Sequence, residues 1–272
     1  MQPSVVIQRL LARERWIMAG ALFLAVTGSG GYILAGGGTG MATLAMVADS
    51  GPLGALISGA PDMIRPMVWT PFYGLVIFVM WWLMMIAMMV PSAAPTILLY
   101  GALNRAHGTW GMLEFLCGYL AVWAGFSLAA TAVQGVLALG GMISAMYMNL
   151  ATPFLGGLAL VGAGLYQLTP MKRACLAHCR GPVVALTRHR RSGRLAALRL
   201  GAVHGSYCLG CCWGLMALLF VGGVMNLWWI LGLMFYVAVE KLAPGGDRFA
   251  VPLAALLIVG GFALLFRSAG VI

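Results

Sequence analysis

The chain has 272 residues, of which 62% are hydrophobic and only 8% are charged, and its mean hydropathy is +0.97. A soluble domain carries roughly 25% charged residues, so this composition is too apolar to cover a water-facing surface and argues against a soluble globular protein. The net charge of +10 does not indicate a nucleic-acid-binding protein. The basic residues flank apolar segments, where they set the orientation of a membrane protein.

Seven apolar segments are expected to cross a membrane as helices, which predicts an all-α, polytopic membrane protein. Most have the length of about 20 residues that a hydrocarbon core requires. The sixth is shorter and follows the fifth after a tight turn near Met225-Asn226, so a single re-entrant unit is the alternative for these two. The 38 glycines favour close contact between helices in lipid. The predicted spans are Trp16–Gly36, Trp69–Val90, Met112–Leu139, Pro153–Pro170, Leu200–Val224, Asn226–Glu240 and Phe249–Arg267.

Residues 1–272 are predicted to form one integral membrane domain. Residues 1–68 supply the first helix and an external connection, and residues 69–272 form the core. With the N-terminus inside and the C-terminus outside, fourteen of the sixteen Lys and Arg residues lie on the cytoplasmic side, as the positive-inside rule requires. The run from Arg188 to Arg191 is interpreted as such a flank, with anionic-lipid or nucleic-acid binding as alternatives. We expect a multi-pass protein of a bacterial inner membrane.

The fifth predicted helix carries an unusual set of soft metal ligands, His204, Cys208, Cys211 and Cys212. At 100° per residue these four side chains fall within an arc of about 100°, on one face of the helix. Buried cysteines are common without a function. However, the Cys211-Cys212 pair lies about one helical turn after Cys208 and two turns after His204, and this spacing favours a metal site. A disulfide is less expected, because the cytoplasmic side is reducing.

Two further segments bring similar side chains to the same half of the membrane. Cys175, His178 and Cys179 follow the fourth predicted helix and share a face if that segment is helical. The second predicted helix ends in methionines, at Met84, Met85, Met88 and Met89. Any one of these thioethers on its own is better explained by core packing.

Two carboxylates, Glu114 and Glu240, lie near cytoplasmic helix ends. Ionisable groups within a membrane are costly and generally functional. For these two, however, solvation at the interface, or for Glu240 an ion pair with the adjacent Lys241, explains their presence without a site.

These stretches resemble a bacterial family of predicted metal-binding integral membrane proteins of unknown function. The resemblance runs from about Trp69 to the end of the chain and implies a metal-binding membrane core. It rests on the Met-Met-x-x-Met-Met-x-Pro-Ser stretch from Met84 to Ser92, Gly118 to Trp123, Cys-x-x-His-Cys from Cys175 to Cys179, His-x-x-x-Cys-x-x-Cys-Cys-Trp from His204 to Trp213, and Val239-Glu240-Lys241.

Thiolate, thioether and imidazole ligands together select Cu(I), and Cys with His also suits zinc. Copper is therefore the expected metal, with zinc or haem as alternatives. We expect a protein that handles Cu(I) by transport, sequestration or delivery, with a metallochaperone or copper enzyme as partner and no nucleic-acid partner. The alternatives are a thiol-redox enzyme that uses its vicinal cysteines and a structural subunit of a larger complex. No P-loop is found, so an enzymatic pump is not favoured.

Overall fold

The computed structural model describes residues 20, 22–35, 69–104, 108–143, 148–181 and 195–270. The described residues form helices, and the only extended pairing among them is an isolated bridge between Ile143 and Leu150. The prediction of an all-α chain is confirmed at this level. Most of residues 1–68, and the basic run from Arg188 to Arg191, lie outside the described residues.

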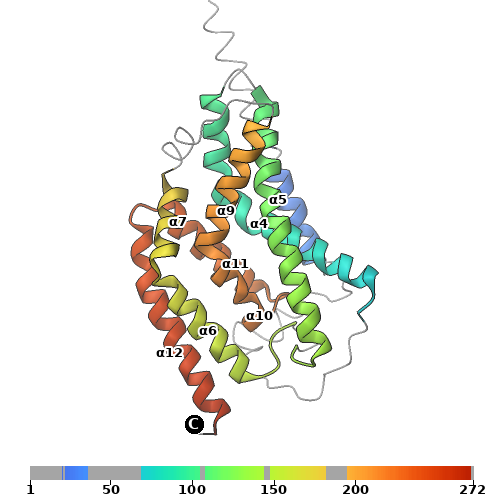
Figure 1. Cartoon of the computed structure of the whole chain (residues 1–272), viewed down its shortest axis with the longest axis vertical. Helices are drawn as coiled ribbons and strands as arrows, with labels where there is room; N and C mark the ends of the chain where they lie inside the picture. Colours follow the sequence, from blue (N-terminus) through green and yellow to red (C-terminus); the bar gives the residue numbers. More distant parts are fainter. Residues whose placement is uncertain are drawn as a thin grey trace, which may run out of the picture.

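The helices follow one another with short connections wherever the chain is described (Figure 1). A short apolar helix, Leu22–Leu34, comes first. It is followed by α4 (Pro71–Leu103), α5 (Gly108–Leu139), α6 (Pro153–Gln167), α7 (Pro170–Arg180), α9 (Ala196–Ala217), α10 (Leu219–Gly222), α11 (Leu227–Leu242), the 3-10 helix η3 (Gly246–Phe249) and α12 (Ala250–Ser268).

Among the described residues, four helices are long and apolar enough to cross a membrane. The bent pair α6–α7 makes a fifth if it counts as one span. Two of the seven predicted spans do not meet this length in the described chain. The first is represented by the short helix Leu22–Leu34, and the sixth is α11 with 16 residues. The four long spans are Pro71–Leu103, Thr109–Leu139, Ala196–Gly222 and Gly246–Ser268.

Helix α4 is longer than the span predicted for it. The predicted span ended at Val90, but the helix continues through Pro91 and Pro95 to Leu103. A proline inside a helix removes one backbone hydrogen bond and bends the helix without necessarily ending it, and Figure 1 shows α4 changing direction along its length. The methionines therefore lie in the middle of a 33-residue helix, not at its end.

The chain bends by 62° between α6 and α7. The Thr169 side chain caps the new helix by accepting a hydrogen bond from the Lys172 backbone N–H, and Pro170 occupies the first position of α7. Proline suits that position because its missing N–H has no partner there in any helix. This bend lays α7 against α9, which brings the Cys175–Cys179 segment beside the cysteines of α9.

Two helix pairs approach closely at glycines, α5 with α9 and α6 with α12. A Cβ atom at Gly201 of α9 would overlap the Phe115 carbonyl of α5, and one at Gly157 of α6 would lie 2.8 Å from the Gly261 oxygen of α12. Small residues permit such backbone contact between helices in lipid. These two pairs hold α9 and α12 in place around α7.

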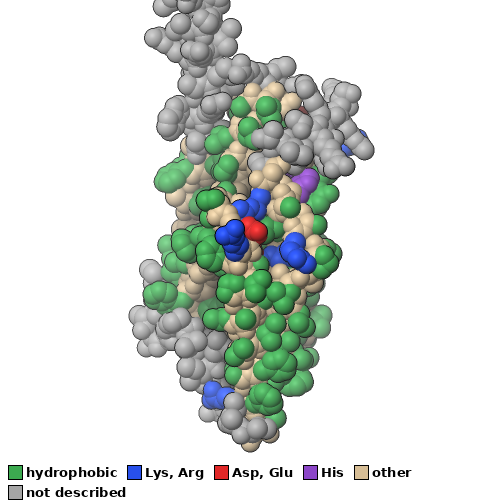
Figure 2. All heavy atoms as spheres, turned by 90° about the vertical axis from the view of Figure 1, so that its left-hand side faces the viewer, with side chains coloured by type: hydrophobic (Ala, Val, Ile, Leu, Met, Phe, Trp, Pro, Cys, Tyr) green, Lys and Arg blue, Asp and Glu red, His purple; other side chains and the backbone are tan. Residues whose placement is uncertain are grey.

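The outer surface of α12 is hydrophobic, and charged side chains gather at one level above it. Figure 2 shows Lys, Arg and acidic side chains grouped at mid-height, above a hydrophobic surface with a single basic side chain near its lower end. Leu256, Val259 and Phe262 of α12 are exposed. This distribution is typical of a helix that meets lipid and ends at a polar interface.

Candidate metal site

The cysteine-bearing face of α9 is buried. His204, Cys208, Cys211 and Cys212 are each at most 5% exposed, whereas Trp213, next in the chain, is 42% exposed. The four predicted ligands therefore point toward the interior of the helix bundle. All six cysteines are free thiols, and Cys117 on α5 is exposed and separate from the others.

Three helices bring their side chains together around Cys208 and Cys212. The Cys212 thiol lies 3.9 Å from the Met89 sulfur of α4. From α11, the Lys241 ammonium donates to the Cys208 sulfur at 3.0 Å and lies 3.9 Å from the Met89 sulfur. We call these four residues, Met89, Cys208, Cys212 and Lys241, the sulfur cluster.

A fourth helix, α5, contributes Tyr119 beside the sulfur cluster, and this side chain is fully buried. Its hydroxyl lies 3.1 Å from the Cys208 sulfur and 3.3 Å from the Met89 carbonyl oxygen. The Cys211 and Cys212 thiols both donate to the Cys208 carbonyl, at 3.1 Å and 2.9 Å. Tyr119 thus links α4, α5 and α9 at the cluster, and the thiols satisfy polar groups of their own helix.

A cavity of about 160 Å³ opens beside the sulfur cluster, and Cys179, His204, Cys208 and Lys241 are among the residues that line it. The Cys179 side chain interacts with both Cys208 and Cys211. His204 is 5% exposed, its ring packs beside Tyr119 and Phe115, and its Nδ1 has no hydrogen-bond partner among the described residues. A buried nitrogen without a partner is costly, and a ligand in this cavity would supply one.

Other predicted ligands lie farther from the cluster or are engaged elsewhere. The His178 ring stacks on Tyr207 with 3.7 Å between ring centroids. Cys175 packs against Gly210, where a Cβ atom would lie 2.8 Å from its sulfur. Met84, Met85 and Met88 are fully buried, but in the described chain only Met89 has its sulfur within hydrogen-bonding distance of a cysteine.

Within residues that the structure describes, no group of three or more His, Cys, Asp and Glu side chains has the arrangement of a metal site. The sulfur cluster has a different composition, with thiols, a thioether and an ammonium. A soft monovalent ion needs few ligands and accepts thioether sulfur. The donor set beside the cavity therefore fits Cu(I) better than it fits a closed zinc site with four Cys and His ligands.

The two predicted carboxylates have different surroundings. Glu114 is half-buried on α5 and interacts with Tyr100 of α4. Glu240 is fully buried and forms an ion pair with Lys172 of α7, which is 1% exposed. The expectation that Glu240 is solvated at the interface or paired with its neighbour Lys241 is therefore wrong. Adjacent residues of a helix point about 100° apart, so Glu240 faces α7 while Lys241 faces the sulfur cluster.

Lys241 and Tyr119 are the members of this site that the sequence reasoning missed as site residues. The sequence offered one indication for Lys241, which stands next to the charged Glu240 in an apolar helix. If both side chains are buried, each needs a partner of its own. No spacing pattern in the sequence indicated Tyr119, because it lies 89 residues before Cys208.

No curated protein and no solved structure is detectably similar to this chain. Residues 78–264 match the family model described as PpoB2, copper chaperone. This range includes every member of the sulfur cluster and both helices of the bent pair. Because the match spans more than half of the 272 residues, the chain belongs to the PpoB2 family of copper chaperones.

Proposed function

We propose that this protein is a membrane-embedded copper chaperone that binds Cu(I) at the sulfur cluster and passes it to a partner protein. The observation that carries the proposal is the meeting of Met89, Cys208 and Cys212 from two helices beside a cavity lined by His204 and Cys179. Membership in a copper-chaperone family supports copper as the metal. Four or five apolar spans among the described residues support a membrane setting.

The chemistry of the donors supports monovalent copper as the cargo. Thiolate and thioether sulfur are soft ligands and select Cu(I) over hard cations. Apolar surroundings oppose free thiolates, so loading the ion and losing the thiol protons are coupled events. When Cu(I) is bound, its charge offsets that of a thiolate, and the Met89 thioether adds a neutral ligand.

Helix α7 provides a path for the ion between the cluster and the protein surface. Cys179 lines the cavity, interacts with Cys208 and Cys211, and is itself only partly buried. Cys175 lies one turn earlier on α7, in contact with α9 at Gly210. A ligand-by-ligand exchange from α7 to α9 would move Cu(I) without releasing it into water, as a chaperone requires.

The first test measures Cu(I) affinity of the purified protein by competition with a chromophoric Cu(I) chelator. Cys208→Ser and Cys212→Ser should each remove most of the binding, because serine keeps the size but replaces the soft ligand. Cys117→Ser is the matched control, since Cys117 is exposed on α5 and away from the cluster. Equal affinity in the wild type, Cys208→Ser and Cys212→Ser would refute the proposal.

The second test compares two methionines of one helix. Met89 and Met80 are both fully buried on α4, but only Met89 lies beside Cys212 and Lys241 in the described structure. Exchanging Met for Leu costs little in a core, so both variants should fold. Met89→Leu should weaken Cu(I) binding on the order of tenfold, about 1.4 kcal/mol, and Met80→Leu should not change it. Equal losses would indicate a packing effect instead of a thioether ligand.

A further inference from the structure

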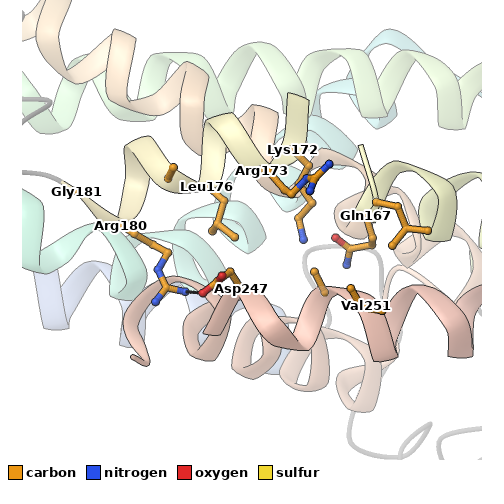
Figure 3. A pocket seen from close by; sticks show the side chains of 11 residues that line it. Gln167, Lys172, Arg173, Leu176, Arg180, Gly181, Asp247 and Val251 are labelled. Carbon is orange, nitrogen blue, oxygen red and sulfur yellow. Dashed lines mark hydrogen bonds and ion pairs between the residues drawn. The ribbon is translucent and has the colours of Figure 1, made fainter. Parts of the chain in front are cut away.

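A second, larger cavity of about 540 Å³ lies on the outer side of α7. It is enclosed by the end of α6, one side of α7, Asp247 of η3 and the first turn of α12 (Figure 3). The sulfur cluster does not line it. The copper function proposed above therefore leaves this cavity without a role.

The cavity is lined by three cationic side chains and one carboxylate, those of Lys172, Arg173, Arg180 and Asp247. Arg180 donates to Asp247 at 3.0 Å and to the Ala243 carbonyl at 2.9 Å, so its charge is already shared. Lys172 pairs with Glu240. Arg173 is exposed, and its side chain has no hydrogen bond or ion pair with any described residue. The lining thus keeps an excess of positive charge that fits an anion.

Gln167 supplies a second, independent indication of a ligand. It is 2% exposed and interacts with Tyr236, but neither its amide nitrogen nor its amide oxygen makes a hydrogen bond of normal geometry in the described chain. Figure 3 shows the Gln167 amide and the Lys172 side chain directed into the space between α7 and α12. Burying an amide without partners costs several kcal/mol in the worst case. A ligand with oxygen acceptors in this space would relieve that cost.

The remaining lining is apolar and continues onto the hydrophobic outer surface. Leu168, Leu176 and Val251 line the cavity, and Val251 is 63% exposed. The cavity lies where the apolar helices α6 and α12 meet the charged side chains of α7 and η3, the level at which Figure 2 groups the Lys and Arg residues. A ligand here meets cations at one end and apolar surface at the other.

We propose that this cavity binds the phosphodiester headgroup of an anionic phospholipid, with the acyl chains lying along the outer surface of α12. The unpaired Arg173 would bind the phosphate, and the Gln167 amide would donate to a headgroup or ester oxygen. Basic pockets between helices on the cytoplasmic side are suited to anionic headgroups. Free phosphate would use the cations but leave the apolar lining without a function, which favours a lipid. The inference rests on the membrane setting proposed above and not on copper binding.

The experiment uses the full-length protein purified in a neutral detergent and follows thermal unfolding by tryptophan fluorescence. Phosphatidylglycerol should raise the melting temperature, and phosphatidylcholine at the same concentration should raise it much less. Native mass spectrometry should detect retained phosphatidylglycerol on the wild type. An equal effect of both lipids would overturn the proposal, because it would show that the cations do not select the headgroup.

Two variants make the test specific to the cavity. Arg173→Gln removes one positive charge from the lining and no interaction within the described chain, so the variant should fold, retain less phosphatidylglycerol and lose most of the melting shift. Arg267→Gln removes one charge at the opposite, exposed end of α12 and should keep the wild-type shift. Equal behaviour of the two variants would overturn the site. An equal shift with inorganic phosphate alone would also overturn the lipid assignment.

Discussion

The buried ion pair between Lys172 and Glu240 predicts a measurable stability effect. Both side chains are at most 1% exposed, and Tyr236 donates a further hydrogen bond to Glu240 at 3.3 Å. Glu240→Gln keeps the volume and one acceptor but leaves the Lys172 ammonium buried without a countercharge. Removing one partner of a buried pair costs about 3–5 kcal/mol. We expect about 3 kcal/mol, the lower end, because the amide oxygen still accepts a hydrogen bond from the ammonium.

The net contribution of the ion pair to the free energy of unfolding should be much smaller than the loss measured for either single substitution. Two desolvated charges give up their hydration, and replacing both with neutral side chains of similar size is often nearly neutral. The double variant Lys172→Met/Glu240→Gln should therefore be more stable than Glu240→Gln alone. Unfolding of the wild type, Lys172→Met, Glu240→Gln and the double variant in a detergent mixture, followed by circular dichroism, gives the four free energies of a double-mutant cycle. A loss below about 1 kcal/mol for Glu240→Gln would refute the reasoning, since that is the size expected of an exposed pair.

Three other predictions concern packing, thiols and topology. Gly201→Ala should destabilise the protein by about 2 kcal/mol, because its methyl group would meet the Phe115 backbone, whereas Gly125→Ala, with open space around it, should be neutral or stabilising in the same unfolding assay. Thiol labelling of the chelated, denatured protein should count six free thiols, and a stable Cys208–Cys212 disulfide in fresh membranes would favour a redox enzyme instead. A reporter fused after Ile272 should be periplasmic and one inserted near Arg190 cytoplasmic, as the basic-residue distribution requires; a cytoplasmic C-terminus would contradict the seven-span topology.

Local sequence was sufficient for most of the helices that the structure describes and for one face of the site. Apolar segments of bilayer length form helices because backbone groups without water must pair within their own segment, and α5, α6 and α12 begin or end within a few residues of the predicted bounds. The spacing of His204, Cys208, Cys211 and Cys212 fixed their common direction, because helical geometry alone sets the angle between them. All four are buried together on α9.

Two predicted helix bounds lie next to prolines, and one of them agrees with the structure while the other does not. Pro170 begins α7, where a proline fits the first helical turn, but Pro91 lies within α4. Thr169, which caps α7, precedes Pro170, whereas the apolar Val90 precedes Pro91. Packing of the neighbouring helices decides whether a helix continues past a proline, because it must compensate for the missing hydrogen bond.

The partners of the cysteines were decided by tertiary structure alone. Met89 is 123 residues from Cys212, and Lys241 is 33 residues from Cys208. No local periodicity relates residues on different helices, so the sequence could not choose Met89 among five neighbouring methionines or identify the partners of Glu240 and Lys241. Those choices depend on the rotation and tilt of α4 and α11 against α9, which are set by the packing of whole helix surfaces.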